Sequence, residues 1–385
     1  MWTKSFFGNR RRLCMNNFGI AADVQNLELR TLPAGTVTAI ISGTGTKERL
    51  TITGDNANNE IVLAVRPTGL FLKADDSDTV IKFGKQTSAP GGELKLKDST
   101  TLPQNLSINM KNGDDNVEIA VGDHFDEISE STGKLPDFIT ATAVSATIGS
   151  TVSVTMGNGD DVFDFAVGPA ASLVIGGAVS VDLGSGDDMY AAGATEAIFQ
   201  TLFSTSIGQE IGGEKRLTMQ GAVSVQGGSG YDLLLMASAV CGGAVTLNSG
   251  SQDNIIDVAN LQVTGKLTIN GSSGSDIVVL RQTVVGGATL INTGAGDDVL
   301  AIKAVSLSKG SSINLGAGDD VLSLGESDIT GSITIDGSSG HDNLAVFSAI
   351  TTNTFAKKLR FEETTLSADS LGDVIVSQIS SMLNG

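Results

Sequence analysis

The chain has 385 residues, a formal net charge of −19 and only 4% aromatic residues. Nucleic acid is excluded as an expected partner, because phosphate recognition needs basic patches that so acidic a chain lacks. With 48 glycines and few aromatics, any core must be thin and aliphatic. No run of 18 apolar residues occurs, so the sequence predicts no transmembrane segment.

Residues 1–35 form the first predicted segment, which is either associated with export or disordered. The basic stretch 9–13 is not followed by the apolar region that an ordinary secretory signal requires. Residues 27–35 read LELRTLPAG. This stretch resembles the leader-proximal L-E-x-R-x-L-P-A-G pattern of large exported bacterial surface proteins. The resemblance implies a secreted or cell-surface location in a bacterium.

Residues 36–100 alternate as strands do but follow no period, and we expect them to form β-rich N-terminal coils or a cap. Residues 101–350 then carry a 22-residue repeat: the turn GAGDDVL at 294–300 recurs at 316–322. The second acidic position of the turn recurs without a gap, at Asp232, Asn254, Asp276, Asp298, Asp320 and Asp342. Such a period identifies a repeat architecture.

Upstream the spacing is less regular. A 44-residue interval separates Asp188 from Asp232, and we interpret it as two coils, the second a decayed repeat that places Glu210 on the column. A 27-residue step leads from Asp161 to Asp188, which predicts one coil with a short insertion. A 46-residue interval, close to two periods, leads from Asp115 to Asp161.

Each period contains three apolar columns. The first includes Val223/Val225, Val245/Leu247, Leu267/Ile269 and Ile333/Ile335; the second includes Leu234/Met236, Ile256/Val258, Val278/Leu280, Leu300/Ile302, Leu322/Leu324 and Leu344/Val346; the third is Met219, Cys241, Val263, Val285, Leu307 and Ile329. The first two alternate with period 2, as strands with one inward face do. The sequence therefore predicts an all-β fold, a right-handed parallel β-helix with three short strands per 22-residue coil.

Residues 351–385 are predicted to form a C-terminal cap. Their apolar residues follow helical spacing at Leu371, Val374, Ile375, Ile379, Met382 and Leu383. An amphipathic helix there would cover the open end of the stacked coils and prevent end-to-end association.

The Gly-Asp turns resemble the G-G-x-G-x-D-x-U-x calcium-binding repeats of RTX-like β-roll proteins, and more closely those of bacterial beta-strand-repeat proteins. The family's aspartate maps onto Asp298, with Leu300 at the U position. The chain departs from the family in its 22-residue period, where the family's is about nine, and in lacking the first glycine. The resemblance implies calcium ligands at Asp161, Asp188, Asp232, Asp276, Asp297, Asp298, Asp319, Asp320 and Asp342.

Electrostatics also favours a cation at these turns. Carboxylates stacked once per coil would stand roughly 5 Å apart and repel one another, and calcium accepts carboxylate and carbonyl oxygens together. The alternative is that glycine and aspartate are simply good turn formers. Asn254, Tyr231, Ser275 and His341 interrupt the acidic pattern and favour that alternative locally.

The outward positions of the first strand are polar: Ser224, Thr246, Thr268, Ser312 and Thr334, beside Gln226, Asn248, Asn270, Asn292, Asn314 and Asp336. One interpretation is a flat face that binds glycan or a cell-surface polymer. The other, which we favour, is threonine's strand propensity beside a stacked asparagine ladder.

No catalytic residues are predicted. The two histidines, His124 and His341, do not belong to a triad or a zinc motif, and the Asp pairs recur on many coils, whereas a catalytic site is usually singular. We therefore expect a non-catalytic extracellular solenoid with a structural, adhesive or binding role. The alternative is a polysaccharide lyase or hydrolase of the parallel β-helix class, in which Arg281 and Lys303, one coil apart, would hold an acidic sugar.

Overall fold

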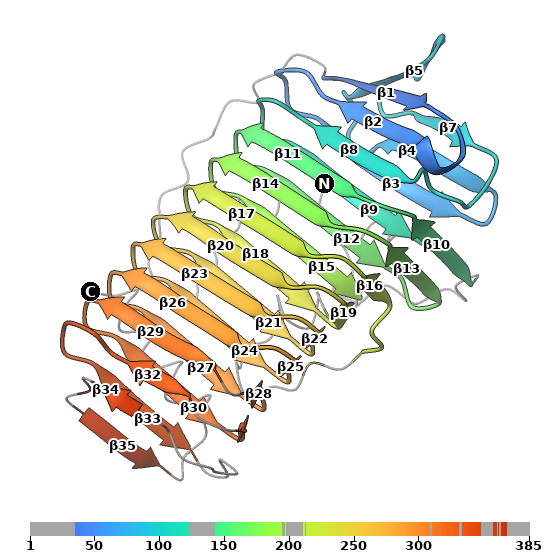
Figure 1. Cartoon of the computed structure of the whole chain (residues 1–385). Coiled ribbons are helices and arrows are strands. Elements are labelled where there is room, and N and C mark those ends of the chain that lie inside the picture. Colours follow the sequence, from blue (N-terminus) through green and yellow to red (C-terminus); the bar gives the residue numbers. More distant parts are fainter. Residues whose placement is uncertain are drawn as a thin grey trace, which may run out of the picture.

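The structure is a computed structural model. It describes residues 35–122, 143–194, 197, 211, 213–308, 310–330, 333–347, 357–359, 361 and 363–367. Apart from one 3-10 turn, η1 (Gly45–Lys47), the elements of this part of the chain are β-strands in three long sheets. Figure 1 shows the strands stacked coil upon coil into an elongated rod, so the predicted β-helical architecture is confirmed.

The first sheet, here called sheet A, has 14 strands. In spatial order they are β34 (Lys357–Leu359), β32 (Thr334–Asp336), β29 (Ser312–Ala317), β26 (Thr289–Ala295), β23 (Leu267–Ser273), β20 (Val245–Ser251), β17 (Val223–Ser229), β14 (Val179–Ser185), β11 (Val152–Asn158), β8 (Asn105–Asn109), β2 (Arg49–Thr53), β1 (Thr36–Ser42), β5 (Val80–Phe83) and β6 (Gln86–Thr87).

The second sheet, sheet B, has 13 strands. They are β35 (Glu363–Ser367), β33 (Asn343–Phe347), β30 (Val321–Gly325), β27 (Val299–Lys303), β24 (Ile277–Arg281), β21 (Ile255–Ala259), β18 (Leu233–Ala237), β15 (Met189–Ala194), β12 (Val162–Val167), β9 (Asn116–Val121), β3 (Glu60–Arg66), β4 (Gly69–Ala74) and β7 (Glu93–Lys97).

The third sheet, sheet C, has eight shorter strands. They are β10 (Val144–Ile148), β13 (Ala171–Ile175), β16 (Leu217–Met219), β19 (Ala239–Cys241), β22 (Gln262–Val263), β25 (Val284–Val285), β28 (Ser306–Leu307) and β31 (Asp328–Ile329). Each regular coil therefore contributes one strand to each sheet, as the three columns predict.

Register follows the 22-residue period. In sheet A, Val225 lies beside Leu247 and Leu247 beside Ile269. These residues, together with Leu280 and Val263 from the other two columns, are at most 1% exposed and belong to one continuous core. Cys241 is a free, buried thiol in the third column. Stacking identical aliphatic positions fills the narrow interior without large aromatic side chains.

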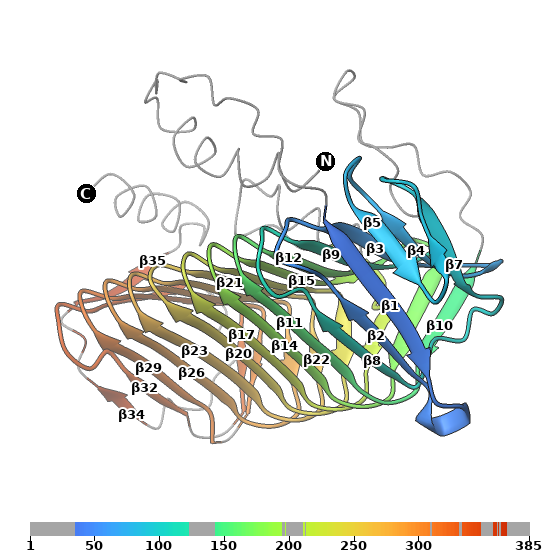
Figure 2. The same cartoon turned by 90° about the horizontal axis from the view of Figure 1, so that it is seen from above.

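The coil array begins earlier than residue 101. Strand β2 pairs in parallel with β8, and β3 with β9, so residues 49–66 already form a coil of the stack. The other strands of 36–100 add antiparallel pairs, β1 with β2, β4 with β3 and β7 with β4, and β5 pairs in parallel with β1. Figure 2 shows these additions gathered at one end of the rod.

The interval between Asp188 and Asp232 contains one coil step rather than two, so the interpretation of an intervening decayed coil is wrong. Val179 pairs directly with Val223, and Met189 with Leu233, each across the full 44-residue interval. Glu210 itself lies outside the described residues. Of this stretch, Ile211 is buried and its N–H donates to Gln282 Oε1 at 2.6 Å, so the chain there reaches the residue that follows β24.

The interval between Asp115 and Asp161 is also one coil step rather than two, since Asn116 pairs with Val162. The 27-residue step from Asp161 to Asp188 is one coil, as predicted, with Val162 paired to Met189. The strands on either side of these long intervals pair directly with each other. The additional residues of an irregular coil therefore fall between strands in the sequence and not within them.

At the other end, the described part of 351–385 continues the coils. Strand β34 pairs in parallel with β32, and β35 with β33. The predicted helical cap, from Leu371 onward, falls outside the described residues and is not supported by the part of 351–385 that is described. Within the described ranges of the chain, no helix is long and apolar enough to cross a membrane.

Part of sheet B is buried on both faces, most completely at β15 and β18. Leu233, Leu235 and Ala237 point away from the solenoid core yet are at most 7% exposed, and they form a second apolar cluster with Ala197 and Ile211. Further along, the outward Val299 and Ala301 are also buried. The continuous apolar runs LLLMA at 233–237 and VLAI at 299–302 are typical of strands buried on both sides.

Candidate functional site: the aspartate turns

The candidate metal ligands lie at the corner where the chain passes from sheet A to sheet B. In one regular coil, β26 ends at Ala295, Gly296 to Asp298 make the turn, and β27 begins at Val299. The second aspartate of each turn is buried, whereas the first faces solvent. The turns thus form two columns, which we name the inner and outer columns.

The inner column contains Asn59, Asp115, Asp161, Asp188, Asp232, Asn254, Asp276, Asp298, Asp320 and Asp342, each at most 2% exposed. The outer column contains Asn58, Asp114, Asp160, Asp187, Tyr231, Asp253, Ser275, Asp297, Asp319 and His341. The predicted ligands are therefore brought together in space, seven of them in the inner column, with Asp297 and Asp319 in the outer.

From Asp115 onward, each inner side chain accepts a hydrogen bond from the preceding coil. The N–H of Asp161 donates to Asp188 Oδ1 at 2.8 Å, and the N–H of Asp298 donates to Asp320 Oδ1 at 2.9 Å. The same bond recurs at each step from Asn59 to Asp342, at 2.7 to 3.1 Å. These side chains satisfy backbone N–H groups at a corner where the strand ladder has no carbonyl to offer.

The outer column repeats this arrangement in the opposite direction. The N–H of Asp319 donates to Asp297 Oδ1 at 2.8 Å, and the N–H of His341 donates to Asp319 Oδ1 at 2.8 Å, so here the acceptor belongs to the preceding coil. Neighbouring peptide N–H groups point along the rod in opposite senses, and one side chain serves each. The Asp-Asp pair is therefore a two-way hydrogen-bond connector between coils.

Burial changes the acidity of the inner aspartates. Desolvation raises the pKa of Asp161 to about 9 and of Asp188 to about 8, with repulsion from neighbouring aspartates adding to it. Desolvation likewise raises the pKa of Asp115, Asp276 and Asp320 to about 7 and of Asp298 to about 6. The hydrogen bond that each accepts from a backbone N–H opposes the shift.

The described acidic side chains of the turns do not by themselves form a calcium cage. Calcium takes six to eight oxygen ligands, and the described residues contain no group of three or more His, Cys, Asp or Glu side chains arranged to hold a metal. Space between turns is also closed: a Cβ on Gly228 would lie 1.9 Å from Gly184 O. The backbones of successive coils are therefore in close contact at Gly228. Calcium binding stays a prediction that rests on the resemblance of the turns.

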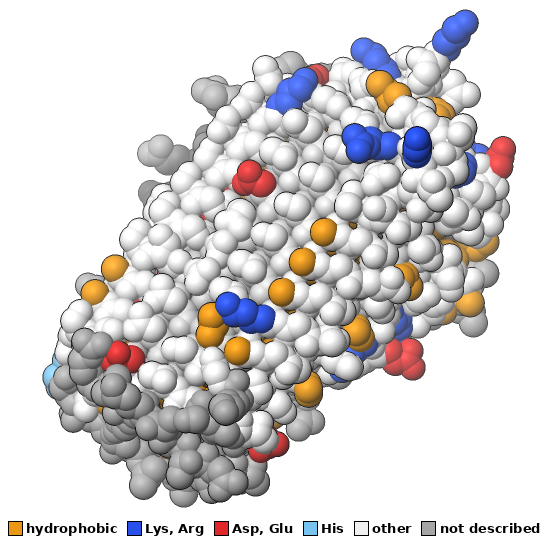
Figure 3. Space-filling view, viewed as in Figure 1, with side chains coloured by type: hydrophobic (Ala, Val, Ile, Leu, Met, Phe, Trp, Pro, Cys, Tyr) orange, Lys and Arg blue, Asp and Glu red, His pale blue; other side chains and the backbone are white. Residues whose placement is uncertain are grey.

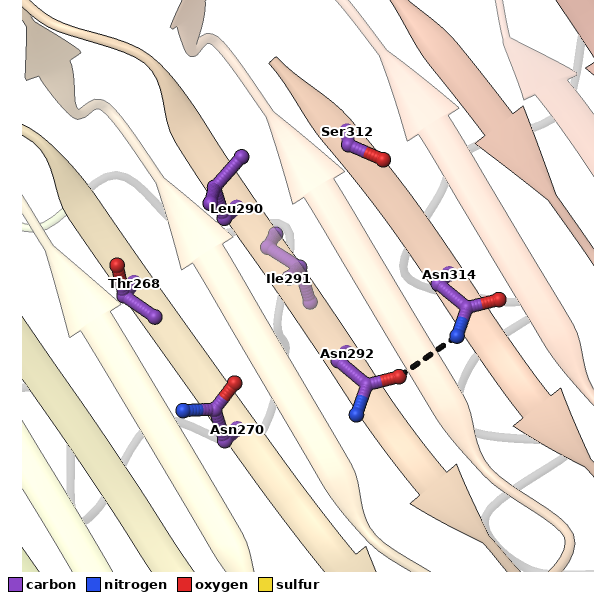
Figure 4. Close-up of a pocket in the computed structure, with 7 residues that line it drawn as sticks. All are labelled: Thr268, Asn270, Leu290, Ile291, Asn292, Ser312 and Asn314. Atoms are coloured by element: carbon purple, nitrogen blue, oxygen red, sulfur yellow. Dashed lines mark hydrogen bonds between the residues drawn. The ribbon is translucent and has the colours of Figure 1, made fainter.

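The outer face of sheet A is broad, flat and almost free of charge (Figure 3). Along it, Asn270 Nδ2 donates to Asn248 Oδ1 at 2.6 Å and Asn314 Nδ2 to Asn292 Oδ1 at 2.7 Å, so the favoured interpretation as an asparagine ladder is supported. A shallow depression of about 270 Å³ lies over this ladder, lined by Thr268, Asn270, Leu290, Ile291, Asn292, Ser312 and Asn314 (Figure 4). It contains no acid or base.

The cationic pair proposed for an acidic sugar is engaged within the protein. Arg281 is 3% exposed, and its Nη2 lies 2.7 Å from Asp257 Oδ2. Lys303 Nζ lies 3.7 Å from Glu326 Oε2. His341 is exposed at its turn, and His124 lies outside the described residues.

Sequence reasoning missed two features of this region. It did not identify Asn59 as a member of the inner column, because the 56-residue interval to Asp115 conceals the coil step. It also treated sheet B as one-sided. The available signal was the run of five apolar residues in LLLMA, which strict alternation does not produce.

Comparisons with known proteins add no assignment. No family model matches the chain, and neither the search of curated proteins nor the search of solved structures gave a match.

Proposed function

We propose that this chain is a non-catalytic, extracellular or cell-surface β-solenoid with a structural, adhesive or binding role. One observation carries the proposal: the same hydrogen-bonded surface recurs on coil after coil, in the Asp turns and along the polar face of sheet A. Catalysis requires a singular site that gathers an acid, a base and a substrate-binding cleft. A repeated surface suits extended contacts with a polymer or a mechanical spacer.

The burial of Arg281 against Asp257 supports this choice over a lyase, because a guanidinium that is 3% exposed and ion-paired is not presented to a substrate. We also propose that the coils wind right-handed, as parallel crossover connections nearly always do. Export to the bacterial surface rests on the LELRTLPAG segment at residues 27–35.

Incubation of the full chain with neutral and acidic polysaccharides separates these roles. We expect no unsaturated or reducing products, and retention on an insoluble glycan would identify the adhesive role. The matched variants are Asn292→Ala, within the depression on sheet A, and Asp182→Ala, on the same sheet but outside that depression. Turnover that Arg281→Met abolishes would establish the lyase alternative instead.

Calcium is tested in the same preparations by thermal melting with calcium, with chelator, and with monovalent salt at matched ionic strength. The resemblance of the turns predicts a melting temperature that rises with calcium and falls with chelator. Monovalent salt screens repulsion without coordinating, so a rise confined to calcium identifies a site.

A further inference from the structure

The asparagine ladder on sheet A is broken at one step between Gln226 and Asn314. Asn248 Nδ2 donates to Gln226 Oε1 at 2.9 Å, and Asn270 Nδ2 donates to Asn248 Oδ1 at 2.6 Å. The bond recurs from Asn314 Nδ2 to Asn292 Oδ1 at 2.7 Å. Asn270 and Asn292 are also direct partners in register, yet no hydrogen bond joins their side chains (Figure 4). Within the described part of the chain, Asn270 Oδ1 is therefore an acceptor, and Asn292 Nδ2 a donor, that the ladder does not use.

The row of side chains beside the ladder changes at the same step. Leu290 stands where the neighbouring coils carry Thr268 and Ser312, and its side chain is only half-buried. A single apolar side chain on a protein surface is ordinary. This one, however, lines the same depression as the unused groups of Asn270 and Asn292. One place on an otherwise repetitive face thus combines a free donor, a free acceptor and an apolar contact.

The size and charge of the depression restrict what it can hold. Its volume of about 270 Å³ lies just below the range of roughly 300 to 1,000 Å³ found for ordinary small-molecule pockets. No charged side chain lines it, and the net charge of −19 disfavours an anionic polymer. Because the depression is shallow, it covers one side of a ligand and leaves the other in solvent. These properties suit one uncharged unit of a longer chain that continues along the flat face.

We propose that the break in the ladder between β23 and β26 is a subsite for one sugar ring of a neutral polysaccharide. A sugar ring offers hydroxyl groups at its edge and an apolar C–H face, and the depression offers a partner for each. Asn270 Oδ1 accepts a hydrogen bond from one hydroxyl, Asn292 Nδ2 donates to another, and Leu290 packs against the C–H face. This inference rests on the adhesive form of the proposed function, and it names the class of ligand and the place where it binds.

Depletion of the full chain from suspensions of cellulose and chitin particles tests the proposal by giving a binding isotherm for each variant. We expect Asn270→Ala and Asn292→Ala each to weaken binding about tenfold, the equivalent of one hydrogen bond. Leu290→Thr, which restores the polar residue that the preceding coil carries, should also weaken it. The matched control is Asn248→Ala, because the ladder already uses both the donor and the acceptor of that amide. It should bind as the unmodified chain does.

Three outcomes overturn the subsite, and each leaves a different part of the proposed function standing. Equal binding by all four variants would keep the adhesive role but remove this place as its site. A lack of binding to either particle by the unmodified chain would leave only a structural role. Self-association in sedimentation velocity that Asn292→Ala abolishes would assign the depression to a second copy of the chain. Release of soluble sugar from the particles would instead contradict the proposed function itself, because that function is non-catalytic.

Discussion

Single residues on the outer face of sheet B illustrate how the chain buries charge in a pair. Asp257 and Arg281 lie in adjacent coils, and their ion pair is only 14% and 3% exposed at the two side chains. Burial raises the pKa of Asp257 to about 6, although Arg281 opposes that shift. Removing the cation would leave this carboxyl without its partner in a poorly hydrated place.

We therefore predict that Arg281→Met lowers the free energy of unfolding by about 3 kcal/mol at pH 7. Adding Asp257→Asn should recover most of the loss, since the neutral amide needs no counter-ion. Urea denaturation of the two variants measures both effects. A single variant as stable as the unmodified chain would show that the pair contributes nothing.

At the scale of the element, the turn between sheets A and B is set by close backbone contact. Gly228 has a φ of 114°, and a Cβ placed there would lie 1.9 Å from Gly184 O in the preceding coil. Gly310 also has a positive φ, 89°, but its Cβ would meet nothing nearer than Ala288 Cβ at 3.9 Å. A comparison of alanine substitutions at these two glycines therefore separates the free-energy cost of a strained φ from the free-energy cost of overpacking.

Gly228→Ala should destabilise the protein by about 3 kcal/mol, the sum of a strained φ and an overpacked turn. Gly310→Ala should cost only about 1 kcal/mol, for the strained φ alone. Equal losses in chemical denaturation would mean that the coils can separate at the turn, and would reopen the space between turns for an ion.

For the whole molecule, the inner column makes stability depend on pH. The folded pKa values of Asp115, Asp161, Asp188, Asp276, Asp298 and Asp320 lie at about 6 to 9, above the ordinary value of 3.8. The folded state thus binds more protons than the unfolded chain at neutral pH. The stabilisation is complete below pH 4 and is lost as the pH rises through the folded values.

We predict that the free energy of unfolding falls between pH 5 and pH 9, by about 1.4 kcal/mol per pH unit for each aspartate that stays protonated in the folded state, and that unfolding at pH 7 releases protons. Denaturation across that range, with proton release followed in weak buffer, measures both. The sign is opposite to that of a chain held together by ionised, paired carboxylates. A stability that rises with pH would contradict the raised pKa values of these buried aspartates.

The regular coils could be predicted from sequence because a parallel stack places equivalent residues in contact. The 22-residue period therefore sets the register of Val225, Leu247 and Ile269, and their alternation sets the inward face. The corner position of the Asp pairs follows from the glycines around them. The opposite directions of their hydrogen bonds could not be predicted in this way, because these directions depend on the orientation of each peptide group.

The sequence by itself determined the repeat, the three columns, the parallel sheets and the aliphatic core, because each is a local pattern repeated at fixed spacing. Only the tertiary structure decided which intervals are insertions, since the 44-residue interval from Val179 to Val223 reads equally as two coils until pairing shows one. It alone showed that Asn59 begins the inner column and that part of sheet B is buried on both faces. It also decided the chemistry of the turns: whether an aspartate is a solvated ion or a buried hydrogen-bonding group depends on what surrounds its oxygens, and those neighbours come from other coils.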